Sequence, residues 1–175
     1  MLEIADQLDR LDHAEQLAFS LCVVDRMCAA KSHFLDPAES KSFADLQILT
    51  TEIWEHLLSG NEITSEEYEG LRTRINSARP PSVGSFSLRN IFWILKSVLK
   101  VFRGREHAYE IARLGIESAT QSKLDETLET HHQSCIIEYL VSLPAMSAEN
   151  VEELRERIRE LPIVTGNVRR AERRD

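Results

Sequence analysis

The sequence lacks the features that mark membrane and secreted proteins. Its longest apolar stretch covers only residues 91–95, whereas a membrane-spanning helix needs about 20 apolar residues. The opening residues, MLEIADQLDRLDH, contain neither the basic nor the apolar segment of a secretory signal. Cysteine is scarce: the chain has three, an odd number, at Cys22, Cys28 and Cys135. They include no CxxC pair. We therefore expect a cytoplasmic protein with free thiols and no membrane span.

The sequence also lacks the common motifs of enzyme active sites. No serine lies in a Gly-x-Ser-x-Gly turn. Neither of the glycine-rich phosphate motifs, Gly-x-x-x-x-Gly-Lys and Gly-x-Gly-x-x-Gly, is present. Cys28 is followed by alanines and has no evident neighbour that would activate its thiol. These absences favour a protein that is not an enzyme and carries no cofactor.

One pattern of zinc-ligating residues is incomplete. His131 and Cys135 are four residues apart, and Glu138 follows about one helical turn later. Structural zinc sites take four ligands, usually as two close pairs, and no second pair is spaced to match. We therefore predict no zinc site and expect these residues to serve as polar caps at a helix start.

A second metal pattern is also partial. Glu129-x-x-His132 is half of a di-iron pattern, which needs another Glu-x-x-His and two further inward glutamates. No second Glu-x-x-His occurs. Glu52 and His56 could add ligands, but they flank Trp54, which we expect at a surface edge. We predict no di-iron centre.

What the sequence does contain is a succession of amphipathic helical patterns. Only 5 prolines and 6 glycines are present, and they fall mainly between these patterns. Apolar residues recur at intervals of three and four in segments at about 2–11, 13–33, 41–59, 64–75, 87–103, 106–130, 132–143 and 148–161. The run Thr64-Ser65-Glu66-Glu67 is typical of a capping box, and no segment alternates with the period of a strand. The sequence predicts an all-α bundle of about seven or eight helices.

The segment at about 87–103 differs from the other helices. Its polar residues form only a narrow stripe of Arg89, Lys96, Lys100 and Arg103. A helix that is apolar nearly all round belongs at the centre of its fold, so we predict this helix to be the central one. A membrane-surface helix with a basic stripe is the alternative.

The strongest interruption in the chain is the proline- and glycine-containing loop at 78–86. A division there would leave two halves that are each marginal folders, because small domains bury too little surface. We therefore predict one helical bundle domain over residues 1–167 and a short basic tail at 168–175.

The charge is uneven along the chain. The net charge is −8, with −11 over residues 1–70, +6 over 71–110 and −3 over 111–175. An acidic N-terminal half suits a basic partner and repels nucleic acid, although such a surface can also serve solubility alone. Phe92 and Trp93 lie among the basic residues, but we expect them to be buried and so unavailable for stacking on bases. Nucleic-acid binding is therefore disfavoured.

Several residues carry a resemblance to a known family. They are Leu8, Leu11, Phe19, Asp25-Arg26-Met27 and Phe34, then Trp54, Glu55 and Leu57, and finally the helix from Leu154 to Leu161 with Gly166-Asn167. In their spacing the chain resembles the YjaG-like family of small bacterial helical proteins. It departs where the family has Pro-Asn-Tyr, since Cys28-Ala29-Ala30-Lys31 stands there. The resemblance implies an all-α fold, and the family has no settled activity.

These observations lead to the hypothesis of a protein-binding helical protein. Its sharpest version is an immunity or antitoxin-like protein that covers the active site of a toxin, because an acidic surface speeds association with a basic partner. The candidate surface consists of acids from the N-terminal half: Asp36, Glu39, Glu62, Glu66, Glu67 and Glu69.

Two alternatives stay open. One is a small metal-dependent enzyme with its site inside the bundle. The other is a homodimeric scaffold, with the small residues of one helix at the interface: Ala108, Ala112, Gly115 and Ala119. The chain is expected to be a monomer or a homodimer.

Overall fold

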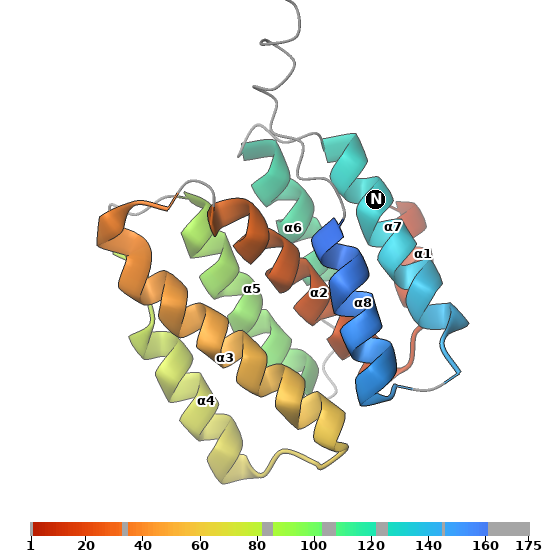
Figure 1. Cartoon of the computed structure of the whole chain (residues 1–175), viewed down its shortest axis with the longest axis horizontal. Helices are drawn as coiled ribbons and strands as arrows, with labels where there is room; N and C mark the ends of the chain where they lie inside the picture. Colours follow the sequence, from red (N-terminus) through yellow and green to blue (C-terminus); the bar gives the residue numbers. More distant parts are fainter. Residues whose placement is uncertain are drawn as a thin grey trace, which may run out of the picture.

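A computed structural model describes six parts of the chain, residues 2–32, 35–81, 86–102, 108–121, 126–144 and 146–160. These parts contain eight α-helices, one short 3-10 helix and no strand (Figure 1). The helices are α1 (Leu2–Leu8), α2 (His13–Ser32), α3 (Ser40–Ser59), α4 (Ser65–Ser77), α5 (Phe86–Phe102), α6 (Ala108–Gln121), α7 (Glu126–Ser142) and α8 (Ala148–Glu160), with the 3-10 helix η1 at Pro37–Glu39. The predicted all-α single domain is confirmed. The basic tail, the Gly166-Asn167 turn and the middle of the 78–86 loop lie outside the described residues.

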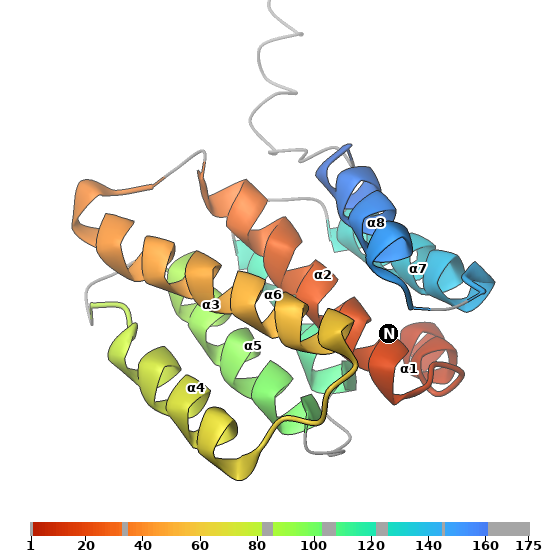
Figure 2. The ribbon, with the colours of Figure 1, turned by 60° about the horizontal axis from the view of Figure 1, so that its bottom comes forward.

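Helix α2 lies between two groups of helices. Helices α3, α4 and α5 pack against one another on one side, and α1, α6, α7 and α8 lie on the other (Figures 1 and 2). Helix α2 contacts members of both groups. Its side chains at Leu17, Leu21 and Val24 are buried, as their helical spacing predicted. Helix α2 is therefore as central to the bundle as α5.

Helix α5 is buried along most of its surface but not all round. Ile91, Leu95 and Val98 are almost fully buried, whereas the side chain of Trp93 is 49% exposed. The expectation that Trp93 is buried was wrong. It lies on the same helical stripe as the basic residues, and the Lys96 ammonium sits 4.9 Å from the centre of its ring. That cation–π contact stabilises an aromatic ring at the surface.

The small residues of α6 face the interior of the same chain. Ala108, Ala112 and Ala119 are buried. A side chain at Gly115 would collide with Val23 and Gln133, because an added Cβ would lie 2.8 Å from the first and 2.9 Å from the second. This face allows α6 to approach α2 and α7 closely, so it is not available as the interface of a homodimer.

The break between α6 and α7 differs from the prediction. Helix α7 begins at Glu126, whereas the sequence patterns placed a helix boundary near residue 131. No proline or glycine marks the true position. His131 and Cys135 therefore lie within α7 and do not cap its start.

Local sequence signals fix the connection between α3 and α4. Gly60 ends α3 in the left-handed conformation at φ 64°, which glycine adopts without strain. Helix α4 starts with the predicted capping box: the Glu67 backbone N–H donates to Thr64 Oγ1 at 3.2 Å, and the Thr64 N–H donates to Glu67 Oε2 at 2.9 Å. The short loop at residues 61–64 is therefore fixed on one side by the end of α3 and on the other by the cap of α4.

In the described parts of the chain, every helix is too short or too polar to cross a lipid bilayer.

Candidate functional site: a groove at the start of α2

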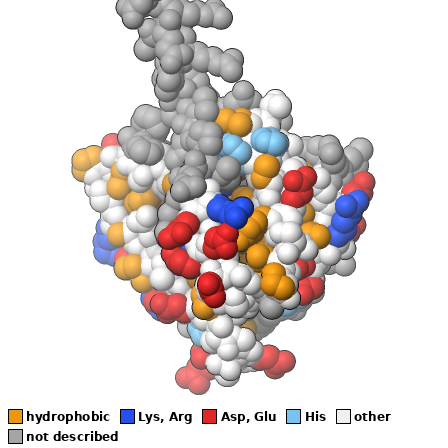
Figure 3. All heavy atoms as spheres, turned by 45° about the vertical axis from the view of Figure 1, so that its right-hand side comes forward, with side chains coloured by type: hydrophobic (Ala, Val, Ile, Leu, Met, Phe, Trp, Pro, Cys, Tyr) orange, Lys and Arg blue, Asp and Glu red, His pale blue; other side chains and the backbone are white. Residues whose placement is uncertain are grey.

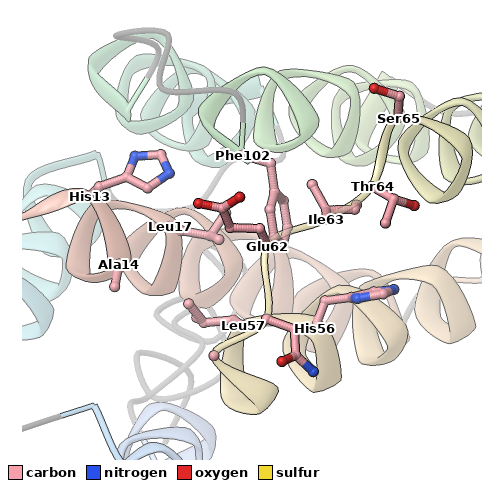
Figure 4. Close-up of a pocket in the computed structure, with 12 residues that line it drawn as sticks. His13, Ala14, Leu17, His56, Leu57, Glu62, Ile63, Thr64, Ser65 and Phe102 are labelled. Carbon is pink, nitrogen blue, oxygen red and sulfur yellow. The ribbon is translucent and has the colours of Figure 1, made fainter.

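A groove of about 470 Å³ opens where α2 begins and where α3 and α5 end (Figure 4). Its lining combines an apolar floor with two imidazoles and one carboxylate. The floor residues come from four different elements, α2, α3, the connecting loop and α5: Leu17, Leu57, Ile63 and Phe102. The polar groups are His13, His56 and Glu62. These elements come together only in the folded chain, so no single segment of the sequence predicts the groove.

The groove carries negative charge on both of its main segments. Residues 12–17 and 55–66 supply eleven of the twelve lining residues. The two segments contain five acids and no lysine or arginine: Asp12, Glu15, Glu55, Glu62 and Glu66. Among the described residues of α5, the base nearest to Phe102 is Lys100, which is half-buried, while Arg103 and Arg105 lie outside the described residues. The two segments that supply most of the lining are therefore acidic, although Glu62 is the one acid among the lining residues themselves.

Two of the acids near the groove are engaged in capping. The backbone N–H of Asp12 donates to Glu15 Oε2, and that of Glu15 donates to Asp12 Oδ1, both at 2.8 Å. Hydrogen bonds of this kind satisfy the free donors of the first turn of α2. They also hold both carboxylates at the start of the helix, so the negative charge beside His13 has a fixed position.

Glu62 is the acid that points into the groove. It is exposed, and it makes no hydrogen bond or ion pair with any residue in the described parts of the chain. Figure 4 shows its carboxylate extending toward the His13 end of the groove. Its neighbour in the loop, Ile63, is half-buried and contributes to the floor. Glu62 is therefore the charged group best placed to meet a ligand there.

The six acids predicted as one partner surface do not form one surface. Glu39 is buried, with only 3% of its surface exposed, and its Oε2 lies 2.5 Å from Lys31 Nζ. Asp36 caps η1 by accepting a hydrogen bond from the Ala38 N–H. Asp36 lies before the start of α3, and Glu62 lies after its end. Because α3 has 20 residues, the helix between them is about 30 Å long. The structure therefore separates Asp36 and Glu39 from the rest of the set.

The other four acids gather at the loop and the first turns of α4. Glu62 and Glu66 are exposed. Glu67 belongs to the capping box, and hydrogen bonds from the Thr64 backbone and hydroxyl lower the pKa of its carboxyl. Glu69 forms an exposed ion pair with Arg72 at 3.0 Å. Of the predicted acids, only Glu62 lines the groove.

A buried polar cluster between α2 and α7 was not foreseen from the sequence. Arg26 Nη2 donates to Glu129 Oε2 at 2.7 Å and lies 2.7 Å from His132 Nδ1. All three residues are buried. Gln133 extends the cluster by donating from Nε2 to the backbone carbonyl of Ala112 at 3.1 Å. In the sequence, the partial Glu129-x-x-His132 pattern was the one signal of this cluster. Both of its residues contact Arg26.

The geometry of this cluster favours a structural role. Burial, and then the nearby positive charge of Arg26, lower the pKa of His132 to about 4. The guanidinium occupies the space beside the carboxylate and the imidazole. Within the described residues, no group of three or more His, Cys, Asp or Glu side chains could hold a metal ion.

The remaining metal-pattern residues also have defined places. His131 Nε2 and Cys135 Sγ are 3.7 Å apart on the outside of α7. Glu52 pairs with Arg74 through two contacts of 2.5 and 2.7 Å. His56 lines the groove. These residues therefore do not converge on one site.

Trp54 was predicted at a surface edge, and that was wrong. It is 1% exposed, and its Nε1 donates to Asp25 Oδ2 at 3.1 Å. The same oxygen accepts from Arg155 Nε, also at 3.1 Å. The carboxylate thereby links α2, α3 and α8, and this role depends on contacts between distant parts of the chain.

The face that includes α7 and α8 offers a contrast to the groove. Figure 3 shows acidic, basic and apolar side chains interspersed there. On α8, for example, Arg157 pairs with Glu153 at 2.7 Å. The opposite charges of such a pair partly cancel each other at a distance.

A solved structure has a similar fold. The crystal structure of a DUF416 family protein from Shewanella baltica OS155 matches this chain with a TM-score of 0.71 and 17% sequence identity, covering 87% of this chain and 91% of that one. At this identity the likeness shows the fold alone. No family model matches the chain, and the comparison with curated proteins gave no match. The neighbour's family is itself uncharacterised, which agrees with the coarser part of the family expectation, while the YjaG-like assignment stays a prediction.

Proposed function

We propose that this chain is a non-enzymatic protein that binds another protein through the groove at the start of α2. The specific form of the proposal is an immunity or antitoxin-like protein that neutralises a toxin by covering its active site. The observation that carries it is the combination of an apolar floor and acidic segments in one open groove. Apolar area supplies binding free energy, while acidic surroundings accelerate the approach of a basic partner.

The chemistry of the groove supports binding more than catalysis. Within the described residues, neither His13 nor His56 makes a hydrogen bond to a serine, threonine or cysteine of the groove. The Thr64 hydroxyl donates instead to Glu67 Oε2 at 2.7 Å, as part of the helix cap. A nucleophilic site needs a nucleophile and a base within hydrogen-bond reach. The groove offers no such pair among its described lining residues.

The cysteines support a cytoplasmic setting for this function. Cys22, Cys28 and Cys135 are all free. Burial raises the pKa of the Cys22 and Cys28 thiols, which keeps them in the unreactive protonated form. Three free thiols, two of them buried and unreactive, suit a reducing compartment.

Site-specific photocrosslinking tests the proposal. A photoreactive phenylalanine analogue is placed at position 61, an exposed lining position of the groove that keeps Glu62 intact, and at position 138 on α7 as the control. We expect a partner protein to crosslink from position 61 and not from position 138. The purified partner is then titrated with the wild type and with the Glu62→Lys/Glu66→Lys variant, which should weaken binding at least about tenfold. If the partner is a toxin, one equivalent of the wild type should abolish its activity.

The control variant is Glu138→Lys, which reverses one exposed acid on another face and is compared with the single variant Glu62→Lys, which changes the net charge by the same amount. It should leave the dissociation constant within about twofold of the wild type. Crosslinking only from position 138, or equal affinity of the groove variant and the wild type, would show that the groove is not the binding surface.

A further inference from the structure

We infer that the groove accepts one long cationic side chain of the partner, an arginine in preference to a lysine. This inference rests on the proposed function, because the side chain belongs to the bound protein. The alkyl stem would lie on the apolar floor, and the guanidinium would pair with Glu62. Three properties of the groove support this occupant.

The first property is the apolar floor. Leu17 is buried, whereas Leu57, Ile63 and Phe102 are only half-buried, so apolar surface faces the groove. Arginine and lysine cover such surface with their methylene stems while their charged ends reach polar groups. A volume of about 470 Å³ lies at the small end of the range for ligand pockets. It suits a side chain with its immediate neighbours and is too small for a whole helix.

The second property is the position of the negative charge. Glu62 points into the groove and has no partner among the described residues (Figure 4). Its loop is held by the end of α3 at Gly60 and by the capping box at Thr64. A carboxylate whose backbone is fixed in advance loses less freedom on binding. It would repel an anionic ligand, and it would lie unpaired beside a purely aliphatic one.

The third property is the match to a planar cation. A guanidinium can form two parallel hydrogen bonds with one carboxylate, which an ammonium cannot. It also stacks on aromatic rings, and Phe102 and Glu62 both line the groove (Figure 4). The imidazoles of His13 and His56 lie among the lining residues and, when neutral, each offers one acceptor nitrogen. Arginine has the donors to use these additional acceptors.

Small probes test this inference on the full chain without a partner. Backbone amide NMR spectra are recorded at pH 8 during titration with n-butylguanidinium, n-pentylammonium, pentanol and pentanoate. We expect saturable shifts at residues 13–17 and 57–65, with millimolar affinity for the guanidinium and weaker affinity for the ammonium. Pentanol should bind more weakly still, and pentanoate should not bind. Glu62→Gln should lower guanidinium affinity at least fivefold, while Glu138→Gln should not change it.

The outcomes separate the two proposals. If pentanoate binds as well as n-butylguanidinium, or if Glu62→Gln keeps full affinity, the inference is overturned. A partner that crosslinks at position 61 while all probes fail to bind would also overturn it, and would leave the proposed function standing. Binding of the guanidinium without any crosslinked protein would instead overturn the proposed function. Because Glu62 is exposed, substitutions at this position should not prevent folding. The circular dichroism spectrum of each variant checks this.

Discussion

Arg26 on α2 and His132 on α7 meet inside the core, with Nη2 of the arginine 2.7 Å from Nδ1 of the histidine. A guanidinium can only donate hydrogen bonds, so Nδ1 is the acceptor. The neutral ring therefore carries its proton on Nε2. The same guanidinium pairs with Glu129, so one buried cation holds both an anion and a neutral imidazole on α7.

The first prediction concerns the pH dependence of stability. The pKa of His132 is lowered from about 6.5 to about 4 in the folded protein. Between these values the unfolded chain binds a proton that the folded chain does not. The contribution of His132 is therefore complete above pH 6.5 and is lost as the pH falls toward 4. Urea unfolding at pH 7.5, 6 and 5 should show the wild type losing stability more steeply than His132→Gln.

The neighbouring histidine on the outside of α7 provides the control for this experiment. His131→Gln removes an exposed imidazole whose charge lowers the pKa of His132 less than burial and Arg26 do, so this variant should keep most of the wild-type dependence on pH. Parallel curves for the wild type and His132→Gln would mean that His132 is not held neutral in the folded state.

The second prediction concerns the buried ion pair of Arg26 and Glu129. Replacing only Glu129 by Met leaves the guanidinium without its anion and should cost about 3–5 kcal/mol of unfolding free energy. Replacing both residues by Met should cost less than that single change, because no unpaired charge stays buried. Denaturant unfolding of the wild type, both single variants and the double variant measures the coupling.

The exposed pair of Lys41 and Asp45 on α3 is the reference for this cycle. Its coupling should be below about 1 kcal/mol. A coupling of Arg26 with Glu129 that is as small as this would argue against a tightly packed cluster.

The third prediction compares two helical glycines. An added Cβ at Gly115 would lie 2.8 Å from Val23, so Gly115→Ala should destabilise the fold by about 1–3 kcal/mol. At Gly70 on α4 the same Cβ meets nothing within 4 Å. Gly70→Ala should therefore stabilise the protein by about 0.4–1 kcal/mol, because alanine favours a helix over glycine. Thermal unfolding should give shifts of opposite sign, and a rise for both variants would refute close packing at Gly115.

The fourth prediction separates the two tryptophans. Trp54 is 1% exposed and hydrogen-bonded to Asp25, whereas Trp93 is 49% exposed. Trp54→Ala should cost about 3–5 kcal/mol of unfolding free energy, and Trp93→Ala about 1 kcal/mol or less. In the wild type, a soluble quencher such as acrylamide should reach the fluorescence of Trp93 much more readily. Equal losses of stability for the two variants would contradict the difference in their burial.

Much of the helical architecture follows from the sequence because its signals are local. The capping box at Thr64 and the left-handed residue Gly60 act within a few residues of backbone, so they are readable from the chain alone. The apolar stripe of Leu17, Leu21 and Val24 likewise depends only on the helical period. Where local signals are weak, as between α6 and α7, the predicted boundary was misplaced.

The environments of the polar and aromatic residues were decided by the tertiary structure. Glu39 and Glu62 are both glutamates of the acidic N-terminal half, yet one is buried against Lys31 and the other is exposed in a groove. The two tryptophans show the same dependence on tertiary packing. Trp54 was expected at the surface and is buried, whereas Trp93 was expected to be buried and is exposed.

The sequence by itself determined that the chain folds as an all-α domain with an acidic N-terminal half, because helical period, caps and net charge are properties of short segments. Only the tertiary structure decided that Glu62 and Phe102 line one groove and that Arg26 contacts His132 in the core. These arrangements depend on how helices that are distant in the chain pack together. No local pattern encodes which side chains from different helices will share a surface.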